Sequence, residues 1–153
     1  MVRWALLGLV GAAAAGSIAW TVFENGEETA VVIPYTDSEA VALGKRVYDE
    51  ACASCHGAEL EGQKNWRQRL PNGRMPAPPH DESGHTWHHV DQQLFELTKY
   101  GVEPFAPDGY ESDMPGFKDI LSDEEILASL AYIKSTWPPS VQKRHDSMRQ
   151  PRG

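Results

Sequence analysis

The chain has 153 residues, 24% of them charged, and a formal net charge of -8 at pH 7. Residues 24–140 hold 21 acidic and 9 basic residues, a net of -12, whereas residues 141–153 hold four basic residues and one acidic residue, a net of +3. An acidic body argues against nucleic-acid binding, which requires basic patches that neutralise phosphates. It suits a basic or dipolar protein partner, and an acidic surface kept for solubility explains it equally well.

The N-terminal segment is predicted to be a membrane anchor. Residues 5–22 carry no charge, and a helix over residues 4–23 would span about 30 Å, the thickness of the hydrocarbon core. Arg3 precedes the run and places the N-terminus in the cytoplasm. A cleaved secretory signal, processed near the alanines at 12–15, is the alternative. We expect residues 1–23 to form a signal-anchor in a bacterial inner membrane, with the following domain on the periplasmic side.

The first helix of the exported domain is predicted to follow a short tether, residues 24–36. Asp37 is a suitable N-cap, and a helical pattern runs from it into a closely spaced pair of cysteines. Gly44 and Tyr48 lie eight and four residues before Cys52. They therefore face the same side of this helix.

Cys52-Ala53-Ser54-Cys55-His56 matches the motif of covalent haem attachment. Two thiols one helical turn apart can reach the two vinyl groups of a porphyrin, and the adjacent histidine can bind the iron. A redox-active dithiol or half of a zinc site would use similar residues. However, no strand pattern precedes Cys52, and the chain has no second cysteine pair. The motif predicts one covalently bound haem c, with Cys52, Cys55 and His56 as its binding residues.

A histidine-rich loop follows, with four of the six histidines in residues 80–89. It could hold a second metal ion, because imidazoles suit copper or zinc. It could instead border the haem, with Trp87 or a histidine donating to a propionate. The absence of cysteine or methionine beside these histidines favours the second interpretation, so Trp87 is a candidate cofactor-binding residue. Next, Asp91 is predicted to cap a helix that Gly101 ends.

Met114 is the predicted second iron ligand. It lies 58 residues after His56, so the chain has room to pass around a haem before reaching it. Pro115 and Gly116 follow it, and a fixed backbone with a tight turn can hold the sulfur in place. Met75 is the alternative, with only 19 residues in which to cross from His56 to the opposite face. Iron held by histidine and methionine is typical of electron-transfer cytochromes.

The last helix of the domain is predicted to begin at Ser122 or Asp123. Both are good N-cap residues, and acidic residues fill the first turn, where the helix dipole favours them. Apolar residues give this helix its buried faces, and Pro138-Pro139 ends it.

These elements together resemble a class I cytochrome c over residues 36–138. The resemblance rests on the glycine–tyrosine helix that enters Cys-x-x-Cys-His, the later Met-Pro, and a final helix containing Leu130-Ala131-Tyr132-Ile133. It implies an all-α fold, the class I cytochrome c fold, with the N-terminal transmembrane helix added. It further implies that the first and last helices cross at Gly44, with Tyr48 near Tyr132 or Ile133.

The resemblance implies an electron-transfer protein and no enzyme. We expect a membrane-tethered mono-haem c-type cytochrome that carries single electrons between redox partners, or a cytochrome subunit of a respiratory or photosynthetic complex. The alternative is a haem enzyme or ligand-binding haem protein with an open sixth position, against which Met114 argues. Residues 37–140 form the expected cytochrome c domain, and residues 141–153 form a basic C-terminal tail.

Overall fold

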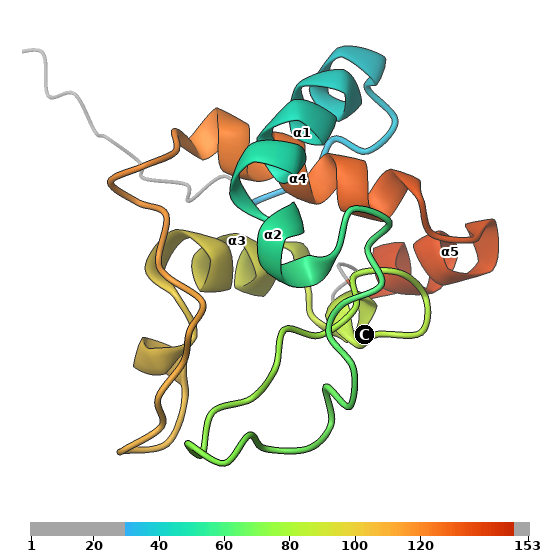
Figure 1. The fold of residues 1–153 in the computed structure, drawn as a ribbon. Coiled ribbons are helices and arrows are strands. Elements are labelled where there is room, and N and C mark those ends of the chain that lie inside the picture. Colours follow the sequence, from blue (N-terminus) through green and yellow to red (C-terminus); the bar gives the residue numbers. More distant parts are fainter. Residues whose placement is uncertain (1–29, 149–153) are drawn as a thin grey trace, which may run out of the picture.

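The computed structural model describes residues 30–148, and all regular elements in this part of the chain are helical (Figure 1). The predicted all-α fold is confirmed. The elements are α1 (Ser38–Ala51), α2 (Ala53–His56), η1 (Thr86–His88), α3 (Asp91–Tyr100), η2 (Glu103–Phe105), α4 (Asp123–Ser135) and α5 (Pro139–Ser147). The predicted membrane anchor, residues 1–23, lies outside the described residues. Within those residues, no helix is both long and apolar enough to cross a membrane.

Helix α1 begins and ends as its sequence predicts. The Asp37 carboxylate accepts hydrogen bonds from the backbone N–H groups of Glu39 (2.9 Å) and Ala40 (3.3 Å), two donors that a helix N-terminus otherwise leaves without partners. Cys52 donates its backbone N–H to Tyr48 O at 2.9 Å, so the chain passes from α1 into α2 with almost no break. Gly57 then ends α2 with a positive φ of 83°.

Helix α1 packs chiefly against α4, and Figure 1 shows the two crossing. Gly44 lies at the contact: a Cβ built on it would be only 1.8 Å from the carbonyl oxygen of Ala128. Tyr48 is fully buried, and its ring centroid lies 5.4 Å from that of Tyr132. The contact implied by the cytochrome resemblance is therefore present.

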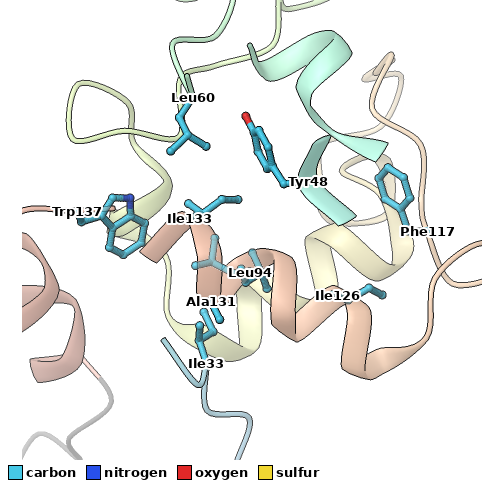
Figure 2. Close-up of a cluster of buried hydrophobic side chains, with 10 residues drawn as sticks. Ile33, Tyr48, Leu60, Leu94, Phe117, Ile126, Ala131, Ile133 and Trp137 are labelled. Atoms are coloured by element: carbon cyan, nitrogen blue, oxygen red, sulfur yellow. The ribbon is translucent and has the colours of Figure 1, made fainter. Parts of the chain in front are cut away.

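Helix α4 supplies much of the hydrophobic core. Ser122 is its N-cap and forms a capping box with Glu125, which fixes where the helix starts. Figure 2 shows side chains of α4 gathered with residues from α1, α3 and the loops around it. The buried hydrophobic cluster consists of Ile33, Tyr48, Leu60, Leu94, Phe117, Ile126, Leu130, Ala131, Ile133 and Trp137.

Asp91, predicted to be the N-cap of α3, has a different position. Val90 is the N-cap, and Asp91 is the first residue of the helix. The Asp91 carboxylate is buried and accepts a hydrogen bond from the backbone N–H of Ile33 at 3.1 Å. It therefore satisfies a donor of the segment before α1, 58 residues away in sequence. Gly101 follows α3 with φ 82° and ends it as predicted.

The first part of the predicted basic tail, residues 141–147, belongs to helix α5. Pro139, predicted to stop the preceding helix, occupies the first turn of the new one, where a missing N–H is harmless. His145 of this helix is fully buried. Asp146 accepts hydrogen bonds from Lys134 Nζ and from the Tyr35 hydroxyl, both at 2.7 Å. Helix α5 is thereby joined to α4 and to the segment before α1.

Candidate functional site

A cavity of about 410 Å³ lies beside the two cysteines. Cys52, Cys55 and His56 line it, as do both candidate methionines, Met75 and Met114. Apolar side chains from α3, α4 and the adjoining loops make up much of the remaining wall: Leu94, Leu97, Val102, Phe117, Leu130 and Ile133. The predicted ligands are thus brought to one largely apolar cavity.

His56 is held in the form that can bind a metal ion. Its ring is buried, and its Nδ1 lies 2.8 Å from the carbonyl oxygen of Pro78. Only a protonated Nδ1 can donate to a carbonyl, so the lone pair of the neutral ring is on Nε2. Burial lowers the pKa of His56, and the Pro78 hydrogen bond partly opposes this shift. The ring is therefore neutral at pH 7, as a metal-binding histidine must be.

The two cysteines lie one helical turn apart and form no disulfide, with Cys52 between α1 and α2 and Cys55 within α2. Burial raises the pKa of Cys52 to about 11, and the neighbouring Cys55 adds to the shift. Redox-active dithiols depend on the opposite shift, a lowered thiol pKa that provides the reactive thiolate. The environment of Cys52 therefore lacks the lowered thiol pKa on which a redox dithiol depends.

Met114 lies in a segment that α3 holds in place. Its N–H donates to Ser112 Oγ at 3.1 Å, and the N–H of Phe117 donates to Thr98 O at 3.1 Å. Gly116 lies against the end of α3, and a Cβ on it would be 2.7 Å from the carbonyl carbon of Tyr100. This glycine permits a close approach between backbones, which differs from the tight turn predicted for it.

Met75 lies on a loop that is tied to the Met114 segment. The guanidinium of Arg74 donates to Glu111 Oε2 at 3.1 Å and also forms an ion pair with Asp113. These groups are exposed, so each pair contributes at most about 1 kcal/mol to stability. Their main consequence is geometric, because they keep the two methionine-bearing segments side by side.

Trp87 is not among the residues that line the cavity. Its indole N–H donates to the carbonyl oxygen of Glu82 at 3.2 Å, its ring stacks on His88 at 3.8 Å between centroids, and Arg144 lies over the ring. The structure therefore does not bring Trp87 together with the other predicted site residues. Its indole N–H already has a partner within the loop.

Unlike Trp87, three of the four histidines in this loop do line the cavity: His80, His85 and His89. Over residues 30–148, no three histidine, cysteine or acidic side chains come together in a group that could hold a further metal ion. His80 is the most closely placed, since its ring stacks on that of His56 with 4.0 Å between centroids and 25° between planes. Burial lowers the pKa of His80 well below its ordinary value, with His56 and His85 adding to the shift. No sequence pattern indicated this contact, which depends on a loop folding back onto the motif.

The residues present fit a covalently attached haem. The cavity is largely apolar, and two thiols lie one turn apart at its edge. His56, whose Nδ1 lies against Pro78 O, and Met114 from a distant segment also line it. Two thiols, an imidazole and a thioether are the donor set of electron-transfer c-type haem sites.

Comparisons with known proteins agree with this site. A family model described as Cytochrome c matches residues 41–137. Two relatives, each named Cbb3-type cytochrome c oxidase subunit FixP, come from Sinorhizobium medicae (strain WSM419) and Rhizobium meliloti (strain 1021). Each is 29% identical over 132 residues, which cover 84% of this chain and 41% of the relative. The chain thus spans about two fifths of the length of these curated relatives.

A solved structure shares the fold. It is the crystal structure of Cytochrome CL from the marine methylotrophic bacterium Methylophaga aminisulfidivorans MPT. The TM-score is 0.53 at 24% sequence identity, and the similarity covers 81% of this chain and 74% of that chain.

Proposed function

The chain belongs to the cytochrome c family, whose members carry covalently attached haem c, and we propose that it is a membrane-tethered carrier of single electrons. One observation supports the proposal most strongly. The residues Cys52, Cys55, His56 and Met114 all line one largely apolar cavity. In such an arrangement the protein would supply two ligands to a haem iron and would leave no open position for a substrate.

Each residue has a separate task in this proposal. Cys52 and Cys55 would hold the haem through two thioether bonds, and His56 and Met114 would bind its iron. When bound, the haem supplies an iron that changes between the ferric and ferrous states. The Pro78 carbonyl keeps the His56 ring in one tautomer, and the largely apolar cavity wall would surround the haem.

We further propose that the carrier works with a membrane electron-transfer complex. The two relatives are, by their names, subunits of Cbb3-type cytochrome c oxidases. The uncharged run at residues 5–22 supports a membrane tether with the haem domain on the periplasmic side. The full-length protein should stay with the membranes after high-salt and carbonate washing. Recovery of a soluble form that begins near Ala15 or Gly16 would favour a cleaved signal instead.

The carrier proposal is tested at the two methionines that line the cavity. Met114→Ala should lose the weak sulfur-to-iron absorption band near the red end of the ferric spectrum. The same variant should have a lower potential and bind carbon monoxide when reduced, because its sixth position is open. Met75→Ala, a matched change on the neighbouring loop, should keep all three properties of the wild type.

Two other results would each point elsewhere. If Met75→Ala loses the band while Met114→Ala keeps it, Met75 is the ligand and the protein is still a carrier. If the reduced wild-type protein itself binds carbon monoxide rapidly, the sixth position is open. The protein would then be a ligand-binding haem protein or a haem enzyme.

A further inference from the structure

His80 packs its imidazole face to face on the imidazole of His56, with 4.0 Å between ring centroids and 25° between ring planes. We propose that His80 is a positioning residue for the axial ligand: it fixes the plane of the His56 ring and stabilises the oxidised state of the site through its π face. This inference rests on the proposed role of His56 as an iron ligand.

His80 is itself held firmly, which a positioning residue requires. Its backbone N–H donates to Leu60 O at 2.8 Å, and its carbonyl oxygen accepts from Trp137 Nε1 at 2.8 Å. Its Nδ1 lies 2.8 Å from the hydroxyl oxygen of Thr86, which is buried. Two of these contacts fix the backbone of His80 and the third fixes its ring, so three separate segments hold the residue in place.

The two contacts of His56 restrain different motions. The hydrogen bond from Nδ1 to Pro78 O fixes one edge of the ring, but the ring can still tilt about that bond. A second ring packed against its face blocks the tilt, because tilting would drive the two rings together. The plane of an axial imidazole controls its overlap with the iron orbitals, so His80 determines a property that Pro78 alone cannot fix.

The stacked ring also affects charge. Oxidation of a bound haem would place positive charge on its iron, and an imidazole that binds the iron would share part of that charge. The face of an aromatic ring carries negative partial charge and attracts cations. A ring held 4.0 Å from His56 therefore favours the ferric state and lowers the midpoint potential.

Three substitutions separate the ring from its polar atoms. His80→Phe keeps a ring face without the nitrogen atoms, His80→Gln keeps polar atoms without a ring, and His80→Leu keeps neither. His88→Leu is the matched control, because His88 stacks on Trp87 and does not line the cavity. The measurements are the midpoint potential and the g-values of the ferric protein in electron paramagnetic resonance, made on protein with haem attached and the sulfur-to-iron band present.

We expect His80→Leu and His80→Gln to raise the potential and shift the g-values. His80→Phe should stay closer to the wild type in both, and His88→Leu should match it. If His80→Leu does not acquire covalent haem, the comparison of His80→Gln with His80→Phe decides in the same way. If His80→Phe has the same midpoint potential and g-values as His80→Gln and His80→Leu, the inference is overturned, whether or not these values differ from the wild type. A wild-type protein that lacks covalent haem would instead refute the proposed function, and with it this inference.

Discussion

At Gly44 two opposing effects act on one backbone position. Glycine inside a helix costs roughly 0.5–1 kcal/mol relative to alanine, so helix propensity alone would favour Gly44→Ala. However, the added Cβ would lie 1.8 Å from the carbonyl oxygen of Ala128 and 2.4 Å from its carbonyl carbon. Both atoms belong to the backbone of α4 and cannot rotate away as a side chain can. The steric effect is therefore the larger one.

We predict that Gly44→Ala lowers the free energy of unfolding of the holoprotein by about 3 kcal/mol, the upper end for overpacked cores. The measurement is denaturant unfolding followed by circular dichroism. Ala42→Gly is the control, since Ala42 is an exposed residue of the same helix, and it should cost only about 1 kcal/mol. A Gly44→Ala protein as stable as the wild type would mean that α1 and α4 are farther apart than described here.

The residues that sequence alone could predict are those whose chemistry is local. Cys52, Cys55 and His56 follow from five consecutive letters, and Gly44 and Tyr48 follow from helical spacing before them. His80 could not be found in this way, because its contact with His56 depends on how the intervening loop folds. Trp87 was predicted from its place in the histidine loop, but its indole N–H donates to a carbonyl oxygen of that loop and the ring is not among those lining the cavity.

Among the elements, α5 was the hardest to predict. Its sequence has little apolar periodicity, and His145 is its one buried residue. The proline pair at 138–139 indicates the end of one helix, but Pro139 equally suits the first turn of another. The helix is stabilised by charged and polar contacts with distant residues, which no local pattern reveals. It also lies outside residues 41–137, the part matched by the family model.

Those contacts centre on Lys134, whose side chain is completely buried. Its Nζ lies 2.7 Å from Asp146 Oδ1 on α5 and 3.6 Å from Asp91 Oδ1 on α3. Lys134 and Asp91 lose their hydration here. The opposite charges offset part of that cost, and the carboxylates of Asp91 and Asp146 also accept hydrogen bonds from other groups. Removal of the lysine would leave two carboxylates close together with no cation between them.

We predict that Lys134→Met destabilises the holoprotein by about 3–5 kcal/mol, the usual cost of breaking a buried ion pair from one side. The double variant Lys134→Met/Asp146→Asn should recover part of this loss, because it removes one carboxylate together with the cation. Lys143→Met, an exposed position on α5, is the control and should change little. Thermal unfolding of the four proteins measures the effect, and equal melting temperatures would show that the cluster contributes nothing to stability.

At the scale of the whole molecule, the same cluster connects stability to pH through His145. Its Nε2 lies 2.8 Å from His89 O, and its Nδ1 lies 3.5 Å from Asp91 Oδ1. Burial lowers the pKa of His145 and the Lys134 ammonium lowers it further, while Asp91, the His89 hydrogen bond and Asp146 oppose the shift. The Trp137 ring packs against the His145 ring in a T-shaped contact, with 5.1 Å between centroids. The folded protein therefore binds a proton at this histidine less readily than the unfolded chain does.

This arrangement predicts a loss of stability in mild acid. In the unfolded chain His145 takes up a proton near its ordinary pKa of about 6.5, whereas the folded protein binds that proton only at lower pH. The unfolded state therefore holds more protons below pH ~6.5, and the free energy of unfolding falls with decreasing pH by up to about 1.4 kcal/mol per pH unit for this group.

His145→Gln should reduce the slope of unfolding free energy against pH between about pH 6.5 and 5, measured on the ferric holoprotein, because it removes the titrating group. His88→Gln, an exchange at an exposed position, should keep the wild-type slope. An unchanged slope in His145→Gln would show that the proton is bound elsewhere, and that the link from α5 to the rest of the domain is independent of pH.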